Sequence, residues 1–285
     1  MRCKELGAAG VLTTAEVQVA ERVNARSTAT LPMESANRFK SGDVEIAYID
    51  EGAGDPVMLI HGFACNFRMN WIETGWIETL KAAGHRVLAY DCRGHGASQK
   101  LYDRSDYSTR IMAEDGLRLL DYLGIKQADV MGYSMGARIA AFMASDHPDR
   151  VRSVIFGGLG KNMLRRMIAM GPVARSMEVK NLNEIKNETL RSFRAFAEST
   201  GSDLNAMAVC LRATRETITP EMLGSIPAPA LVVCGSEDVF SGSPEELAAM
   251  VPNGEAVEIT GCTHQETVPD PMHKQAVVEF LDRRP

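Results

Sequence analysis

The sequence of 285 residues lacks several features that would place a protein in a broad class. No apolar run approaches the length needed to span a bilayer, and no internal repeat or low-complexity tract is present. The net charge of −6 argues against a nucleic acid or an anionic membrane surface as a partner. No cysteines form a C-x-x-C pair, so we expect reduced thiols in a cytoplasmic protein, with no metal site and no cofactor. The cysteines are Cys3, Cys65, Cys92, Cys210, Cys234 and Cys262.

What is present is the composition of a globular protein, with 45% hydrophobic and 24% charged residues. The length suits one large α/β domain with an insertion. Residues 1–36 differ from the rest, and we expect an extension that is disordered or loosely docked, or a start codon assigned too early. Glu16, Glu21 and Arg22 interrupt any apolar core, so this segment is a poor signal peptide. The alternative is a packed amphipathic helix over residues 14–25.

Short apolar runs alternate with amphipathic stretches, which predicts strands and helices in turn. The expected strands are residues 44–50, 56–60, 85–90, 127–132, 151–156, 228–235 and 256–260. Residues 44–50 alternate apolar and polar side chains, which predicts an edge strand of an antiparallel pair. The expected helices include residues 71–83, 108–123, 244–251 and 271–281. Repeated strand–helix units require right-handed crossovers and a mostly parallel, doubly wound sheet.

The alternation breaks between residues 161 and 224. Only helical patterns occur there, at residues 163–170, 182–199 and 204–214. A block of helices between two strands of a parallel sheet is an insertion. We therefore expect a core of residues 37–160 and 225–285, with residues 161–224 as a helical lid.

The segment from Gly132 to Gly136 reads Gly-Tyr-Ser-Met-Gly, follows an apolar run and precedes a helical pattern. This is the sequence form of a nucleophile elbow. A sharp strand-to-helix turn strains the central residue, and crowding favours glycine two residues to either side. Ser134 is the candidate nucleophile, at a helix N-terminus that favours developing negative charge. The alternative is a glycine-rich turn with a capping serine.

A serine nucleophile needs a base, and the histidines after Ser134 are His147, His264 and His273. His264 lies in a loop directly after the last expected strand, so it is the preferred base. His147 ends the helix that follows Ser134 and is expected to cap it. His273 lies inside the last helical pattern.

The acid that orients the base should follow a strand between Ser134 and His264. Asp238 comes just past a strand end, and its neighbour Glu237 is the main competitor. Asp203 falls within the helical insert. We expect Asp238 to stay ionised and to fix the tautomer of the imidazole.

A tetrahedral intermediate needs two hydrogen-bond donors for its oxyanion. The backbone N–H of Met135, directly after Ser134, is one candidate. The N–H of Phe63, in the loop after the first buried strand, is the other. Gly62 lets the backbone come close, and His61 is interpreted as a side chain that supports the loop.

Five segments together resemble the α/β-hydrolase superfamily, in its lidded, carboxylesterase-like serine-hydrolase form. They are His61 to Phe63, Asp91 to Ser98, Gly132 to Gly136, Gly235 to Asp238 and Gly261 to His264. The resemblance covers about residues 38–283. It implies an eight-stranded, mostly parallel sheet with a helical lid, and a structural role for the turn from Arg93 to Gly96.

The resemblance also implies a catalytic triad of Ser134, Asp238 and His264, with an oxyanion hole from Phe63 and Met135. A serine rather than an aspartate nucleophile counts against the dehalogenase and epoxide-hydrolase branches. The three-glycine form of the oxyanion loop is absent, which counts against the esterase branch that carries it.

Methionines are frequent in the insert, and such adaptable apolar side chains suit a lid over an acyl or alcohol group. Met163 and Met167, together with Tyr133 beside the nucleophile, are candidate substrate contacts. The alternative for the methionines is packing between lid and core.

The sequence therefore predicts a serine esterase that cleaves carboxylic esters of small to medium acyl chain through an acyl-enzyme. One alternative is a lyase, a lactonase or a C–C hydrolase of the same fold. The menaquinone-pathway synthase of this fold also has an arginine four residues after the serine, and this sequence has Arg138 at that position. Another alternative is a non-catalytic ligand receptor. The expected partner is a small-molecule ester, and the oligomeric state stays open, with a homodimer among the possibilities.

Overall fold

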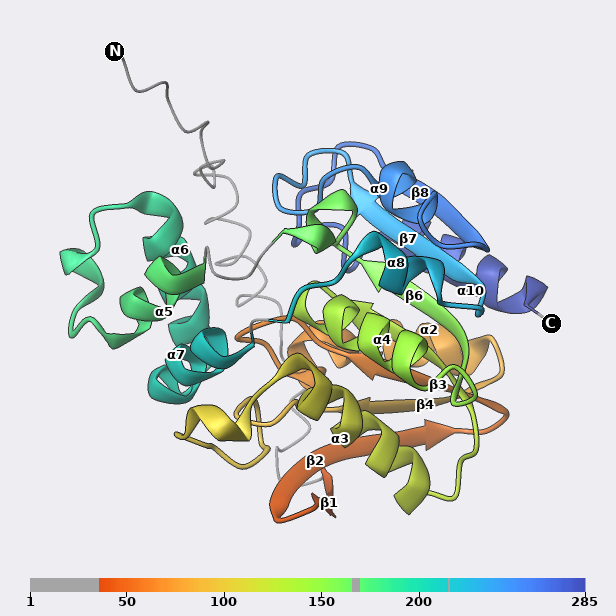
Figure 1. Ribbon diagram of the computed structural model, residues 1–285, viewed down its shortest axis with the longest axis horizontal. Coiled ribbons are helices and arrows are strands. Elements are labelled where there is room, and N and C mark those ends of the chain that lie inside the picture. The colour runs from red at the N-terminus through yellow and green to blue at the C-terminus, as the bar shows by residue number, and fades with distance from the viewer. Residues whose placement is uncertain (1–35, 166–169, 215, 285) are drawn as a thin grey trace.

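The computed structural model describes residues 36–165, 170–214 and 216–284 (Figure 1). Residues 1–35 of the predicted N-terminal extension, which include the alternative helix at residues 14–25, lie outside these ranges, as does Met167. No helix within them combines the length and the apolar composition that crossing a membrane requires.

Eight strands form one sheet in the order β1-β2-β4-β3-β5-β6-β7-β8 (Figure 1). They are β1 (Asn37–Ser41), β2 (Val44–Gly52), β3 (Asp55–Ile60), β4 (His85–Tyr90), β5 (Ala128–Tyr133), β6 (Val151–Gly157), β7 (Ala230–Gly235) and β8 (Gly254–Ile259). The pairs β1–β2 and β2–β4 are antiparallel, and the remaining pairs are parallel. The predicted mostly parallel, eight-stranded sheet is confirmed.

The prediction that residues 44–50 form an edge strand is wrong. β1 occupies the edge and pairs Asn37 with Tyr48 and Ser41 with Val44, so β2 lies second in the sheet. β1 has only five residues, of which Phe39 and Ser41 are buried. A pattern this short does not separate a strand from a loop in the sequence.

Alternate residues of the buried strands face two different helical layers. In β3, Val57 and Leu59 join one apolar cluster, whereas Met58 and Ile60 join the other. This follows from the period of two along a strand, and it explains why strands covered on both faces read as continuous apolar runs.

Helices cover both faces of the sheet (Figure 1). On one face lie α3 (Thr109–Tyr122), α4 (Met135–Asp146), α8 (Pro220–Gly224) and α9 (Pro244–Ala248). On the other lie the π-helical turn η2 (Arg68–Ile72), α2 (Trp76–Ala82) and α10 (Pro271–Arg283). The predicted helix at residues 71–83 is thus two elements. Gly75, with a φ of 79°, separates them because a left-handed residue cannot continue a right-handed helix.

Between β6 and β7 the described residues form helices and loops but no strand. We call the helical elements that precede α8 the α5–α7 group. Its elements are η4 (Lys161–Leu164), α5 (Gly171–Glu178), η6 (Leu182–Glu184), α6 (Glu188–Ser199) and α7 (Leu204–Ala213). α5 to α7 stand to one side of the sheet (Figure 1) and share a separate apolar cluster that includes Val173, Met177 and Met207. The predicted helix at 182–199 begins only at Glu188, because Asn187 caps it by accepting from the N–H of Leu190.

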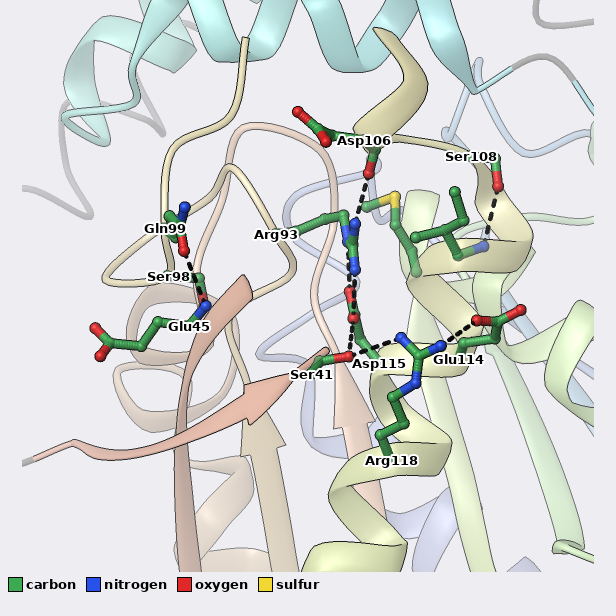
Figure 2. Close-up of polar contacts among 12 residues, drawn as sticks. Ser41, Glu45, Arg93, Ser98, Gln99, Asp106, Ser108, Glu114, Asp115 and Arg118 are labelled. Atoms are coloured by element: carbon green, nitrogen blue, oxygen red, sulfur yellow. Dashed lines mark hydrogen bonds and ion pairs between the residues drawn. The ribbon is translucent and has the colours of Figure 1, made fainter. Parts of the chain in front are cut away.

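A buried ion pair connects the turn that follows β4 to helix α3 (Figure 2). Arg93 donates through Nε and Nη2 to the two carboxylate oxygens of Asp115 on α3, each at 2.7 Å. Ser41 of β1 donates to the same carboxylate at 2.5 Å, and Arg93 also donates to Asp106 O. Asp115 is fully buried. These contacts support the structural role that the resemblance implied for this turn.

Candidate active site

The loops that carry the predicted site residues leave the sheet at one edge. His61 to Phe63 follow β3, Ser134 follows β5, Asp238 follows β7 and His264 follows β8. These strands run parallel through β5, β6 and β7. Because the carboxyl ends of parallel strands lie at the same edge, residues far apart in the sequence converge there.

Ser134 stands on a strained turn between β5 and α4. Its φ of 55° and ψ of −110° lie where side chains are rarely tolerated, and its N–H donates to Gly157 O at 2.8 Å. A Cβ at Gly132 would lie 2.1 Å from Gly136 O, and a Cβ at Gly136 would lie 2.0 Å from Ile60 O. Both flanking glycines are therefore required by close backbone contact. Within the described residues the Ser134 hydroxyl makes no hydrogen bond.

His264 and Asp238 form a hydrogen-bonded pair. Nδ1 of His264 lies 2.7 Å from Oδ2 of Asp238. Oδ1 of the carboxylate accepts from the N–H groups of Phe240 at 2.8 Å and Ser241 at 3.2 Å, and the Asp238 side chain is fully buried. Glu237, the competing acid, is exposed. A carboxylate held by three N–H groups makes Nδ1 of the imidazole a donor and leaves Nε2 as the acceptor.

Two aromatic rings lie close to the imidazole. The Tyr133 and His264 ring centroids are 5.2 Å apart, and those of Phe240 and His264 are 5.5 Å apart. Tyr133 is buried and its hydroxyl donates to His264 O. Burial, together with the nearby Asp238 carboxylate, raises the pKa of Tyr133, so the hydroxyl remains a donor at neutral pH. Tyr133 thus holds the histidine loop.

The loop after β3 passes directly beside the nucleophile. A Cβ at Gly62 would lie 3.6 Å from Ser134 Cβ. Asn70 Oδ1 accepts from the Gly62 N–H at 3.0 Å. His61 is fully buried, donates through Nδ1 to Gly62 O and accepts at Nε2 from the Cys92 N–H. Burial lowers the pKa of His61, which keeps this two-sided support neutral. The interpretation of His61 as a loop support is confirmed.

The loop also belongs to the cluster of the α5–α7 group. Ala64 has a φ of 52°, is fully buried in that cluster, and accepts at its carbonyl from Ser202 Oγ at 3.3 Å. The Phe63 side chain packs against the same cluster. Over the described ranges, the backbone N–H groups of Phe63 and Met135 donate to no other protein group, so both are free for a ligand.

The remaining candidates lie away from this constellation. Met163 has no exposed surface and packs in the main core, so its side chain is not accessible to a ligand in this structure. His147 caps α4, as expected, and His273 is buried in α10. Asp203 caps α7. Arg138 is buried and donates to the backbone oxygen of Arg165, tying α4 to the segment after η4.

Sequence reasoning missed three side chains at this edge. Asn70 holds Gly62, and Phe240 packs against His264, while Phe193 of α6 packs in turn against Phe240. Asn70 lies in a helical turn with no motif around it. The two phenylalanines are separated by β7, so no local pattern pairs them.

No metal-binding cluster of three or more His, Cys, Asp or Glu side chains is found among the described residues. The five cysteines within those ranges are free. Burial raises the pKa of Cys65, Cys210 and Cys234 to about 12, so these thiols stay protonated at neutral pH.

Comparison with known proteins bears on the fold that carries these residues. The sequence model of a family described as alpha/beta hydrolase fold matches residues 55–215. A fluoroacetate dehalogenase from Burkholderia sp. is 37% identical over 116 residues, which are 40% of this chain and 37% of that protein. This chain thus spans just over a third of that relative.

Two further proteins match over most of their length. A 2-hydroxy-6-oxononadienedioate/2-hydroxy-6-oxononatrienedioate hydrolase from Cupriavidus pinatubonensis is 28% identical over 260 residues, covering 79% of this chain and 86% of that protein. The crystal structure of a hydrolase from Pseudomonas aeruginosa PA01 has a TM-score of 0.69 at 24% identity, and covers 87% of this chain and 98% of that one.

The family match takes in more than half of the chain, including strands β3 to β6 and the turn at Ser134. The Pseudomonas structure has a similar fold. On these grounds the chain belongs to the α/β-hydrolase fold family.

Proposed function

We propose that this chain is a serine hydrolase that cleaves carboxylic esters with small to medium acyl chains. The observation that carries the proposal is the His264 Nδ1–Asp238 Oδ2 contact of 2.7 Å at the sheet edge where Ser134 stands. This pairing supports an imidazole orientation in which Nδ1 donates to the carboxylate and Nε2 can accept a proton. The strained turn of Ser134, whose side chain is only partly buried, supports its role as the nucleophile.

In the proposed reaction, Ser134 Oγ attacks the ester carbonyl carbon while His264 Nε2 takes the hydroxyl proton. The carbonyl π electrons move to oxygen, and the N–H groups of Phe63 and Met135 hold the resulting oxyanion. One such donor contributes about 3 kcal/mol in other hydrolases. The intermediate then expels the alcohol, which receives the proton from His264. Water attacks the acyl-enzyme by the same route, the acid leaves, and Ser134 regains its proton.

The first step requires a hydrogen bond between Ser134 Oγ and His264 Nε2. The described residues contain none between these atoms. Such catalytic hydrogen bonds are commonly long without substrate and tighten in the substrate complex. We therefore place the formation of this contact in the substrate-bound state.

Residues 161–224 are proposed to act as a lid over this edge, on a core of residues 37–160 and 225–285. The support comes from the loop after β3, since Phe63 and Ala64 pack against the cluster of the α5–α7 group. A cover that excludes water strengthens the electrostatic interactions inside the site.

The test is a series of p-nitrophenyl esters from acetate to laurate, with intact-protein mass measured during turnover. We expect acyl mass on the protein, lost together with turnover in Ser134→Ala. Ser145→Ala, on the same helix, is the matched control and should retain both. Absence of turnover across the series, or equal turnover by Ser134→Ala, would contradict the proposal.

A second candidate is the hydrolysis of a carbon–carbon bond. It is supported by the Cupriavidus relative, a 2-hydroxy-6-oxononadienedioate hydrolase by name, because that match covers 79% of this chain. Comparing kcat/KM for that dienedioate with the ester series distinguishes the two. A dienedioate cleaved faster than every ester would favour this candidate.

A further inference from the structure

Three rings stand in a row from α6 to His264. The ring centroids of Phe193 and Phe240 are 5.8 Å apart at an interplanar angle of 66°, and those of Phe240 and His264 are 5.5 Å apart at 74°. Both contacts are edge-to-face arrangements, which aromatic rings prefer. Phe193 and Phe240 are half-buried, so each keeps part of its surface free. We call these two rings the aromatic wall.

The aromatic wall is held from both ends. The N–H of Phe240 donates to Asp238 Oδ1 at 2.8 Å, and its carbonyl accepts from Asn162 Nδ2 at 3.0 Å. On α6, Arg194 adjoins Phe193, is 4% exposed, and donates to Ser176 O of α5 at 2.9 Å. These bonds fix the backbone on both sides of the row, so the rings are placed before any ligand arrives.

The two aromatic rings close to the imidazole differ in exposure. Tyr133 is 3% exposed, and its hydroxyl donates to His264 O. Phe240 is only half-buried and retains free surface. A ligand group beside His264 therefore meets the aromatic wall.

We propose that Phe193 and Phe240 bind the alcohol part of the ester and select flat, apolar alcohols such as phenols and naphthols. This inference rests on the proposed ester hydrolysis. In that reaction His264 Nε2 gives its proton to the departing oxygen, which must lie within hydrogen-bond reach of the imidazole. The side chains beside the imidazole thus flank the alcohol part. Aromatic edge-to-face contacts favour a flat ring over a saturated one there.

The experiment keeps the acyl group constant and varies the alcohol. The ratio of kcat/KM for 1-naphthyl acetate to that for cyclohexyl acetate is measured in the wild type, Phe193→Leu and Phe240→Leu. Dividing each variant's ratio by the wild-type ratio cancels the intrinsic reactivity of the two esters. Leucine keeps an apolar side chain and removes the ring, so each variant should lower the ratio roughly threefold to tenfold. The ratio for p-nitrophenyl butyrate to acetate should not change.

Phe196→Leu is the matched control, because Phe196 lies on the same helix and packs against the same cluster as Phe193. Within the described residues, only Phe193 of the two makes a ring contact with Phe240. The alcohol ratio of Phe196→Leu should equal that of the wild type. If Phe240→Leu fails to fold, Phe193→Leu still tests the subsite, since Phe193 makes no ring contact with the imidazole within the described residues. Ester turnover with unchanged alcohol ratios would overturn the subsite and leave the proposed function standing. A wild type that cleaves no ester would overturn both.

Discussion

His264 Nδ1 lies 2.7 Å from Asp238 Oδ2, whereas the adjacent carboxylate of Glu237 points into solvent. Two neighbouring acids thus differ in a way that substitution can measure. Asp238→Asn replaces the acceptor that fixes the imidazole tautomer, so kcat for ester hydrolysis should fall by about ten-thousand-fold, as for the equivalent change in serine proteases. Glu237→Gln should retain wild-type kcat. If Glu237→Gln caused the larger loss, the acid would be wrongly assigned.

Gly136 packs its backbone against β3, and an added methyl group would lie 2.0 Å from Ile60 O. Because the clash is with backbone, no side chain can move aside. Gly136→Ala should lower the free energy of unfolding by about 3 kcal/mol or more, measured by urea denaturation. Gly171→Ala is the control, since a Cβ there meets only Arg175 Nη1 at 3.8 Å, and it should change stability by less than about 1 kcal/mol. Similar losses in both variants would refute this account of the elbow.

Because Arg93 and Asp115 form a buried ion pair (Figure 2), removing the charge of Asp115 should strongly lower the free energy of unfolding. Asp115→Asn leaves a buried guanidinium without its counter-charge, which should lower the free energy of unfolding by about 3–5 kcal/mol. Glu114→Gln removes a carboxylate from the adjacent position of α3, where it pairs with Arg118 at the surface. That variant should lose less than about 1 kcal/mol. The free energies of unfolding of the two variants are compared by denaturation in parallel. Equal decreases would show that the buried pair contributes no more to stability than the exposed pair.

Buried neutral histidines predict a loss of stability in mild acid. Burial lowers the pKa of His273 from 6.5 to about 4, and that of His95 from 6.5 to about 3. In mild acid, these two imidazoles therefore bind protons in the unfolded chain but remain neutral in the folded chain. The contribution of these histidines to the free energy of unfolding is fully present above pH 6.5. It declines as the pH falls toward their folded-state pKa values, by at most about 1.4 kcal/mol per pH unit for each histidine.

His273→Asn isolates one of these contributions. His273 Nδ1 donates to Thr267 O at 2.8 Å, and an asparagine amide can donate in its place without titrating. The free energy of unfolding should then fall less steeply between about pH 6.5 and 5 than in the wild type. An unchanged slope in urea titrations would mean that His273 is not part of the acid response.

Much of the site was predictable because its signals are local. Gly132 is required by a contact with Gly136 O in the same turn, and Gly136 by a contact with Ile60 O of β3, yet both glycines stand within five consecutive residues around Ser134. His264 and Asp238 each follow a predicted strand, and the common edge of a parallel sheet brings such positions together.

The parts that sequence reasoning missed depend on contacts between distant segments. Phe193 and Phe240 meet only because α6 docks near the loop after β7. Met163 has the same apolar character in a lid as in a core, and only the fold shows that it is buried. The break at Gly75 was hidden because apolar spacing continues across it from Trp71 to Trp76.

Ala64 links the loop beside the nucleophile to helices made much later in the chain. Its partners in the buried cluster, Val173 and Met207, belong to α5 and α7, and Ser202 donates to its carbonyl. During synthesis, the strand and elbow emerge before these partners exist. The segment that carries Phe63 therefore completes its packing contacts only after α7 has been synthesised, so this loop is among the last parts of the nascent chain to gain its native surroundings.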